Sequence, residues 1–143
     1  GVAGYPEKHA ESPNMQADTK YLKEKIDAGA DYIVTQMFFD NKVYFDFVDR
    51  CRKAGITVPI IPGLKPISTK SQLNTLPKTF SISIPEALQL EIDKCKDNTE
   101  ARQVGVEWAI AQSKELVAAG VPVLHYYSMG KSDNIKAIAS EVF

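Results

Sequence analysis

A neutral amide, Gln36, stands where a run of apolar and β-branched residues ends. The run covers residues 32–35 and lies between a glycine that stops a helix, Gly29, and a polar turn at residues 40–41. This pattern predicts a strand covered on both faces, and the C-terminal ends of such strands line active sites. An amide both donates and accepts hydrogen bonds, so Gln36 suits a flat heterocycle with amide-like edges. The alternative is a glutamine that caps the strand and bonds the nearby backbone.

Polar side chains follow each of the four strands that the sequence predicts. They are Tyr5, Glu7, Lys8 and His9 after the first strand, Gln36 and Asp40 after the second, Lys65 and Gln72 after the third, and Tyr126, Tyr127, Ser128 and Lys131 after the last. Both parallel α/β architectures keep their binding sites at these strand ends. The placement therefore favours a binding function there.

Four charged or titratable residues each have two interpretations. His9 can donate a hydrogen bond to a phosphate, or it can be a solvated loop histidine. Asp18 lies near a helix N-terminus, where a carboxylate stabilises the helix dipole, and a ribose contact is the alternative. Lys25 is more simply a solvated charge on a helix. His125 lies inside a predicted strand, which favours a core or layer residue over a catalytic one.

Several classes of function lack their sequence signals. The two histidines make no zinc pattern, and there is no G-x-G-x-x-G, P-loop, nucleophile elbow or closely paired carboxylates. A formal net charge of -1 argues against nucleic-acid binding, and no run is long enough to span a membrane. Cys51 and Cys95 are isolated, which favours buried reduced thiols and a cytoplasmic location. The chain shows no signal peptide, and without an initiator Met we expect it to have been cut or processed.

The elements that must position these residues alternate regularly. Strands are predicted near residues 2–5, 32–38, 58–61 and 121–127, and helices at about 15–29, 41–54, 71–76 (ended by Pro77), from 84 onward, 98–119 and 134–142. Alternating βα units predict a parallel sheet with right-handed crossovers, in one domain of residues 1–143. This α/β pattern fits either an open doubly wound sheet or a partial TIM (βα)8 barrel, because a full barrel needs about 250 residues. Four strands could supply half of one.

The sequence resembles methylenetetrahydrofolate reductase over essentially its whole length. The matching blocks are Gly4-Tyr5-Pro6-Glu7-Lys8-His9, Gln16-Ala17-Asp18, Lys25-Ile26-Asp27-Ala28-Gly29-Ala30, Thr35-Gln36-Met37-Phe38-Phe39-Asp40, Ile60-Ile61-Pro62-Gly63-Leu64-Lys65-Pro66-Ile67 and His125-Tyr126-Tyr127. The first and fourth blocks together are highly specific. The resemblance implies a (βα)8 barrel that holds FAD, of which this chain would supply the C-terminal half, strands five to eight.

The resemblance also implies roles for particular residues. Those implied for FAD are Tyr5, His9, Ser12, Asp18 and Lys25, with His9 near the pyrophosphate. Gln36 is implied for the folate pterin and for the nicotinamide of NAD(P)H, and Gln72 for the folate. Lys131 falls where the family commonly has an arginine that meets the folate, and lysine lacks the bidentate fork of arginine. Leu76 stands where some bacterial members have a phenylalanine, and contacts at Tyr21 and Glu24 are not implied.

By this resemblance, the parent protein would reduce 5,10-methylenetetrahydrofolate to 5-methyltetrahydrofolate with NAD(P)H through FAD. The proton-donating glutamate belongs to the N-terminal half, so no catalytic residue is expected here, and the fragment alone should be inactive. Two alternatives remain: a non-catalytic binding or scaffold half-barrel, and an unrelated phosphate-binding barrel enzyme. A half-barrel exposes an apolar edge and interior, so we also expect self-association into a homo-oligomer.

Overall fold

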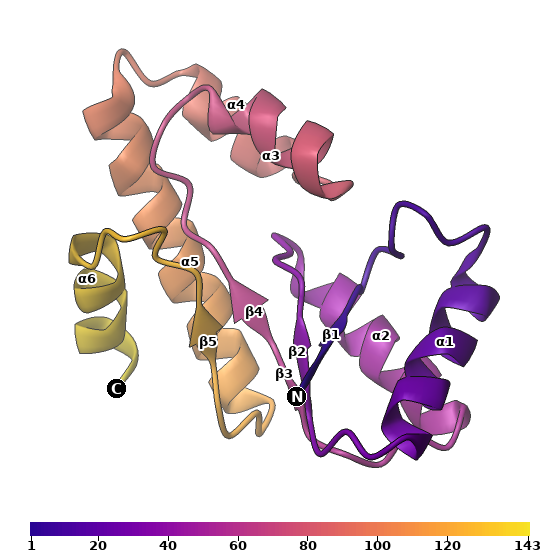
Figure 1. Ribbon diagram of the computed structural model, residues 1–143. Coiled ribbons are helices and arrows are strands. Elements are labelled where there is room, and N and C mark those ends of the chain that lie inside the picture. The colour runs from indigo at the N-terminus through magenta and orange to yellow at the C-terminus, as the bar shows by residue number, and fades with distance from the viewer.

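The computed structural model describes residues 1–143, and parallel strands alternate with helices along them (Figure 1). The elements are β1 (Val2–Gly4), α1 (Met15–Asp27), β2 (Ile33–Thr35), α2 (Asn41–Lys53), β3 (Ile60–Ile61), β4 (Gly63–Leu64), α3 (Gln72–Phe80), α4 (Glu86–Asp93), α5 (Asn98–Ala118), β5 (His125–Tyr126) and α6 (Asp133–Val142). The predicted α/β class with parallel strands is confirmed. No helix is both long and apolar enough to cross a membrane.

The strands form two small parallel sheets that share one stretch of chain. The first has the order β1-β2-β3, with Val2 opposite Ile33 and Ile33 opposite Ile60. The second pairs β4 with β5, with Gly63 opposite His125. The predicted third strand, residues 58–61, appears as β3 and ends at Pro62, which has no N–H to offer a ladder, and β4 is a further short strand that the sequence did not predict. At Pro62 the chain therefore stops pairing with β2 and begins to pair with β5.

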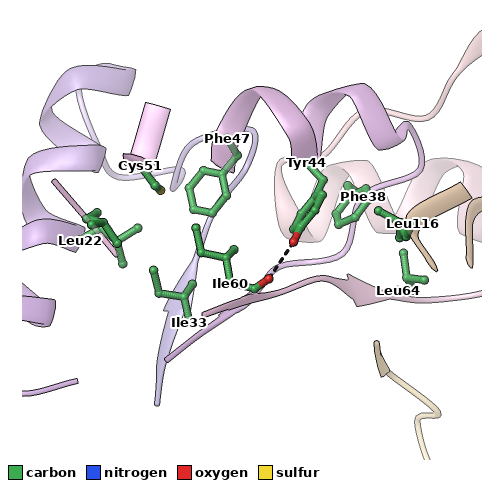
Figure 2. Close-up of a cluster of buried hydrophobic side chains, with 10 residues drawn as sticks. Leu22, Ile33, Phe38, Tyr44, Phe47, Cys51, Ile60, Leu64 and Leu116 are labelled. Carbon is green, nitrogen blue, oxygen red and sulfur yellow. Dashed lines mark hydrogen bonds between the residues drawn. The ribbon is translucent and has the colours of Figure 1, made fainter. Parts of the chain in front are cut away.

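Two hydrophobic clusters hold the helices in place. In the first, α1 and α2 pack against β1, β2 and β3 around Ile33, Phe47 and Leu22. The hydroxyl of Tyr44 donates to the carbonyl of Ile60 at 2.7 Å, so this buried phenol is satisfied (Figure 2). The second cluster joins Met37, Phe39 and Ile67, which follow the strands, to apolar residues of α3, α4 and α5. The helices α3 and α4 therefore lie beyond the ends toward which the strands point (Figure 1).

The face of the sheet opposite the helices is not covered within this chain. Ala3 in β1 and His125 in β5 are exposed, and so are Tyr32 and Val123 just before β2 and β5. The expectation that the second strand is covered on both faces is therefore wrong for this chain. His125 was expected to be a core or layer residue, and its exposure rules out the core position. Apolar composition alone does not show which segments meet to bury a strand.

Helix α3 continues through Pro77, although the sequence predicted that it would end there. A proline inside a helix removes one backbone hydrogen bond. The helix nevertheless extends to Phe80, because Leu76 and Phe80 on either side of the proline pack into the second cluster. Its C-terminus is Ser81, which has a left-handed φ of 54°. Packing thus outweighs the local preference.

Candidate functional site

The loop between β1 and α1 is held by its own side chains. Lys8 has a positive φ of 78°, which is uncommon outside glycine. Its ammonium donates to the carbonyls of His9 at 2.9 Å and Ser12 at 2.6 Å. The backbone N–H of Lys8 donates to the carbonyl of Tyr5. Lys8 therefore shapes the loop from within, a role that the sequence pattern did not indicate.

Asp18 fastens this loop to the first turn of α1. Its Oδ1 accepts a hydrogen bond from the Ser12 hydroxyl at 2.8 Å and another from the His9 backbone N–H at 3.3 Å. Ser12 is buried, with 8% of its surface exposed. The carboxylate thus has two structural hydrogen-bond donors. The sequence had suggested only the helix dipole or a ribose contact for it.

The His9 ring has a defined orientation. Its Nδ1 accepts the backbone N–H of Glu11 at 3.1 Å, so the ring proton lies on Nε2, which is left as a donor. The ring also packs edge-on against Tyr5, with centroids 4.6 Å apart at an interplanar angle of 85°. This arrangement presents one N–H donor beside an aromatic ring.

A hollow of about 380 Å³ lies over this loop and helix. All five residues predicted for FAD line it: Tyr5, His9, Ser12, Asp18 and Lys25. The remaining lining residues are Ala3, Gly4, Glu11, Tyr21 and Leu22. The sequence missed these because Ala3, Gly4 and Leu22 carry no polar group, and because Glu11 and Tyr21 matched no family block. The structure therefore gathers residues 3–25 around one open space.

The chemistry of this hollow suits a ligand with anionic and hydroxyl groups. Lys25 is exposed and takes part in no ion pair or side-chain hydrogen bond, so its charge is free for a ligand. The Nε2–H of His9 is a second donor, and the Oδ2 of Asp18 is an unused acceptor. Tyr5 and Leu22 supply apolar surface. A dinucleotide with a pyrophosphate, a ribose and a flat ring has these features.

Gln36 lies at the end of β2, apart from the main part of this hollow. Its backbone N–H donates to the carbonyl of Gly4 at 2.8 Å, which continues the pairing of β1 with β2. Its side-chain Oε1 accepts the N–H of Met37 at 3.0 Å, which is the backbone-bonding alternative raised from the sequence. The side-chain N–H₂ has no partner. Gln36 and Tyr5 line a space of only about 10 Å³, closed by Phe80 at the end of α3 and by Ile82 just after it.

Gln72 begins α3 at the end of one loop, and Lys131 lies in a second loop that meets the first. The Oε1 of Gln72 accepts the backbone N–H of Ser68 at 2.7 Å, and the Ser68 hydroxyl accepts from Asn134 of α6 at 3.2 Å. Lys131 is exposed three residues before Asn134 and follows Met129 and Gly130, which both have positive φ. Neither Gln72 nor Lys131 lines the hollow that contains His9 or the small space beside Gln36. The structure joins these two loops to each other without bringing either into contact with Gln36.

Other polar residues at the strand ends have structural partners. Asp40 accepts from the Lys42 N–H and caps α2. The Glu7 carboxylate accepts from the Ser83 N–H at 3.0 and 3.1 Å, and burial raises the pKa of Glu7 above its ordinary value. The Tyr127 hydroxyl donates to the carbonyl of Thr35 at 2.7 Å. These contacts tie the strand ends to one another and to the segment between α3 and α4.

The structure contains no group of three or more His, Cys, Asp or Glu side chains that could hold a metal ion. Cys51 and Cys95 are free and buried, as the sequence predicted. Burial raises the pKa of the Cys51 thiol to about 11. A thiol with this pKa is a packing group and is not a nucleophile near neutral pH.

The fold defines an α/β protein with parallel strands, in which polar side chains of the loop after β1 and of α1 surround one hollow. Residues 1–142 match the family model of methylenetetrahydrofolate reductase, so the chain belongs to that family. It is 40% identical over 138 residues to 5,10-methylenetetrahydrofolate reductase of Escherichia coli, a match that covers 96% of this chain and 47% of that protein. It is 42% identical over 133 residues to methylenetetrahydrofolate reductase 2 of Saccharomyces cerevisiae, covering 90% of this chain and 22% of the yeast protein.

The chain thus spans less than half the length of these relatives. Among solved structures, an uncharacterized protein from Clostridium thermocellum that binds two copies of 5-methyl-5,6,7,8-tetrahydrofolic acid has a similar fold. Its TM-score is 0.59 and its sequence identity is 21%, over 98% of this chain and 50% of that one. At this identity the likeness concerns the fold alone.

Proposed function

We propose that this chain is the C-terminal half, strands five to eight, of the (βα)8 barrel of a flavin-dependent reductase. The complete protein would reduce 5,10-methylenetetrahydrofolate to 5-methyltetrahydrofolate with NAD(P)H through FAD. The observation that carries the proposal is the single hollow around Tyr5, His9, Ser12, Asp18 and Lys25. Membership of the family supports the same reading.

In this proposal the loop and helix hold FAD by their charges and donors. The Lys25 ammonium would pair with the pyrophosphate, the Nε2–H of His9 would donate a hydrogen bond to it, and the free Oδ2 of Asp18 would accept from a ribose hydroxyl. Ser12 keeps Asp18 and the loop in position through their hydrogen bond. FAD itself supplies the hydride chemistry when it is bound. The residues of this chain only bind and orient it.

Gln36, Gln72 and Lys131 would hold the folate in the same proposal. Gln36 would use its unpartnered N–H₂ and its Oε1 on the pterin edge, and later on the nicotinamide. Because Phe80 and Ile82 close the space beside Gln36, the end of α3 and the segment after it must move to admit a ring. The Clostridium thermocellum neighbour that binds 5-methyl-5,6,7,8-tetrahydrofolic acid makes a folate ligand reasonable for this fold. Lys131 would offer one positive charge to the glutamate tail.

Purification of the complete protein tests this directly. We expect a yellow protein with flavin absorbance that oxidises NAD(P)H and reduces 5,10-methylenetetrahydrofolate. The Gln36→Leu variant should retain flavin but bind folate at least about tenfold more weakly, because both polar groups are lost. A colourless protein that ignores flavin and folate would overturn the proposal and favour the scaffold half-barrel. Tight binding of another phosphate ligand in place of FAD would favour an unrelated barrel enzyme.

Residues 1–143 studied alone should behave differently from the complete protein. We expect no reductase turnover from them, because the proposed proton donor lies outside this segment. We also expect self-association, because Ala3, Val123 and His125 leave the sheet face exposed. Measurable turnover would contradict the first expectation. A monomer in sedimentation at high concentration would contradict the second.

A further inference from the structure

Lys65 is the only charged residue in the buried set of this protein. It is 6% exposed, whereas the other buried polar residues are all neutral. It follows β4 directly and lies in a run, residues 62–67, in which every residue is buried. A lysine ammonium is almost never fully buried unless it is paired. The position of Lys65 therefore needs an explanation.

No group within the chain pairs with this ammonium. None of the five ion pairs includes Lys65, and its only side-chain hydrogen bond is to the carbonyl of Pro66 at 3.5 Å, the outer limit of such a bond. Burial lowers the pKa of Lys65, and no nearby carboxylate opposes that shift. An uncompensated buried charge destabilises the folded protein. No group in this chain compensates for the buried charge.

Lys65 stands at the same end of the sheet as the proposed site residues. The pairing of β4 with β5 places Leu64 opposite Tyr126, so one step further Lys65 is level with Tyr127. Tyr127 in turn bonds the carbonyl of Thr35, the residue before Gln36. The N–H of Gly63 also donates to the Thr35 hydroxyl at 2.9 Å. Lys65 and Gln36 thus follow neighbouring strand segments and end at the same edge.

We propose that Lys65 is an anion-binding residue of this strand-end site, whose ammonium pairs with a negatively charged group of a bound ligand. The inference rests on the proposed function, which supplies two such groups: the ring of a reduced flavin and the carboxylates of a folate glutamate tail. A lysine that pairs with a ligand destabilises the ligand-free protein and stabilises the ligand-bound one. A lysine with a structural role stabilises the ligand-free protein.

The test compares wild type, Lys65→Met and Lys78→Met in the complete protein. Methionine keeps the length of the side chain without its charge. Lys78 is an exposed α3 lysine with no ion pair, so its variant controls for the loss of one positive charge. Unfolding by urea reports the ligand-free stability, and the flavin midpoint potential and the folate dissociation constant report binding. A pteroate analogue without the glutamate separates the two anion sources.

Lys65→Met should be at least as stable as wild type without ligand. It should also lower the flavin midpoint potential or weaken folate binding about tenfold, while Lys78→Met does neither. Loss of the folate effect with the pteroate analogue assigns Lys65 to the glutamate tail, and a changed potential assigns it to the reduced flavin.

Two results would overturn the assignment of Lys65 without overturning the proposed function. One is a destabilised ligand-free Lys65→Met, which would mean that a carboxylate elsewhere in the protein pairs with the ammonium. The other is a Lys65→Met variant that holds flavin and folate as wild type does, with the same folate dissociation constant and the same flavin midpoint potential. A wild type that binds neither ligand would instead overturn the proposed function, and the ligand assignment with it.

Discussion

The carboxylate of Asp18 accepts a hydrogen bond from the buried hydroxyl of Ser12 at 2.8 Å, which joins the first turn of α1 to the loop that carries His9. The same oxygen accepts the His9 backbone N–H. The hollow proposed for FAD therefore depends on one carboxylate that orders the loop from the helix side. Its removal should affect both the fold and the ligand.

Asp18→Ala should lower the free energy of unfolding by about 1–3 kcal/mol, because it leaves the buried Ser12 hydroxyl without its charged acceptor. FAD affinity in the complete protein should fall at least about tenfold as the loop loosens. Asp18→Asn can still accept from Ser12, so it should lose less stability. Urea unfolding and flavin fluorescence titration measure both effects. Glu24→Gln, at an exposed position on the same helix, is the control, and equal losses in all three variants would refute this role.

Lys25→Met should weaken FAD binding without changing stability. Lys25 is exposed and unpaired, so no internal contact is lost. One charge-assisted contact with a phosphate is worth about 1.5–3 kcal/mol, roughly a tenfold or larger rise in the dissociation constant. The affinity of wild type should fall with salt more steeply than that of the variant. Lys20→Met, on the same helix but outside the hollow, should bind FAD like wild type. An equal loss of FAD affinity in Lys20→Met would show that the effect comes from net charge and not from a contact made by Lys25.

Glu7 should make the protein less stable as the pH rises. Burial raises the pKa of Glu7 above its ordinary value of 4.5, so the folded state holds the proton longer than the unfolded state. Its contribution is fully present below pH 4.5 and is lost as the pH rises through the folded pKa. Glu7→Gln removes this loss while its carbonyl can still accept from Ser83. The variant should gain stability over wild type between pH 4 and pH 7, measured by urea unfolding, and a difference that shrinks over this range would contradict the mechanism.

Gly105 allows α5 to approach the backbone of the buried run after β4. A Cβ at this position would lie 1.9 Å from the carbonyl oxygen of Ile67, and backbone atoms cannot move aside as a flexible side chain can. Gly105→Ala should therefore destabilise the protein by about 1–3 kcal/mol, although alanine favours a helix by about 1 kcal/mol. Gln103→Ala, exposed on the same helix, should stay within about 0.5 kcal/mol of wild type. A stabilised Gly105→Ala would show that the contact is looser than the structure indicates.

The grouping of residues around the hollow is the part of the candidate site that the sequence predicted best. Tyr5, His9, Ser12, Asp18 and Lys25 lie within about one loop and one helix, so their proximity follows from local chain geometry. The loop's internal links, through Lys8 and Asp18, could not be read from a pattern because they depend on a positive φ and on side-chain reach. The roles of these residues toward FAD remain predictions.

The sequence by itself determined the alternation of strands and helices, because apolar periodicity and capping residues such as Asp40 act over a few neighbouring positions. Only the tertiary structure decided that a further strand, β4, follows Pro62 in a second sheet, that α3 continues past Pro77 and closes the space beside Gln36, and that His125 is exposed. It also decided that Lys65 is buried without a partner. Burial and strand pairing depend on segments far apart in the chain, and no local pattern contains that information.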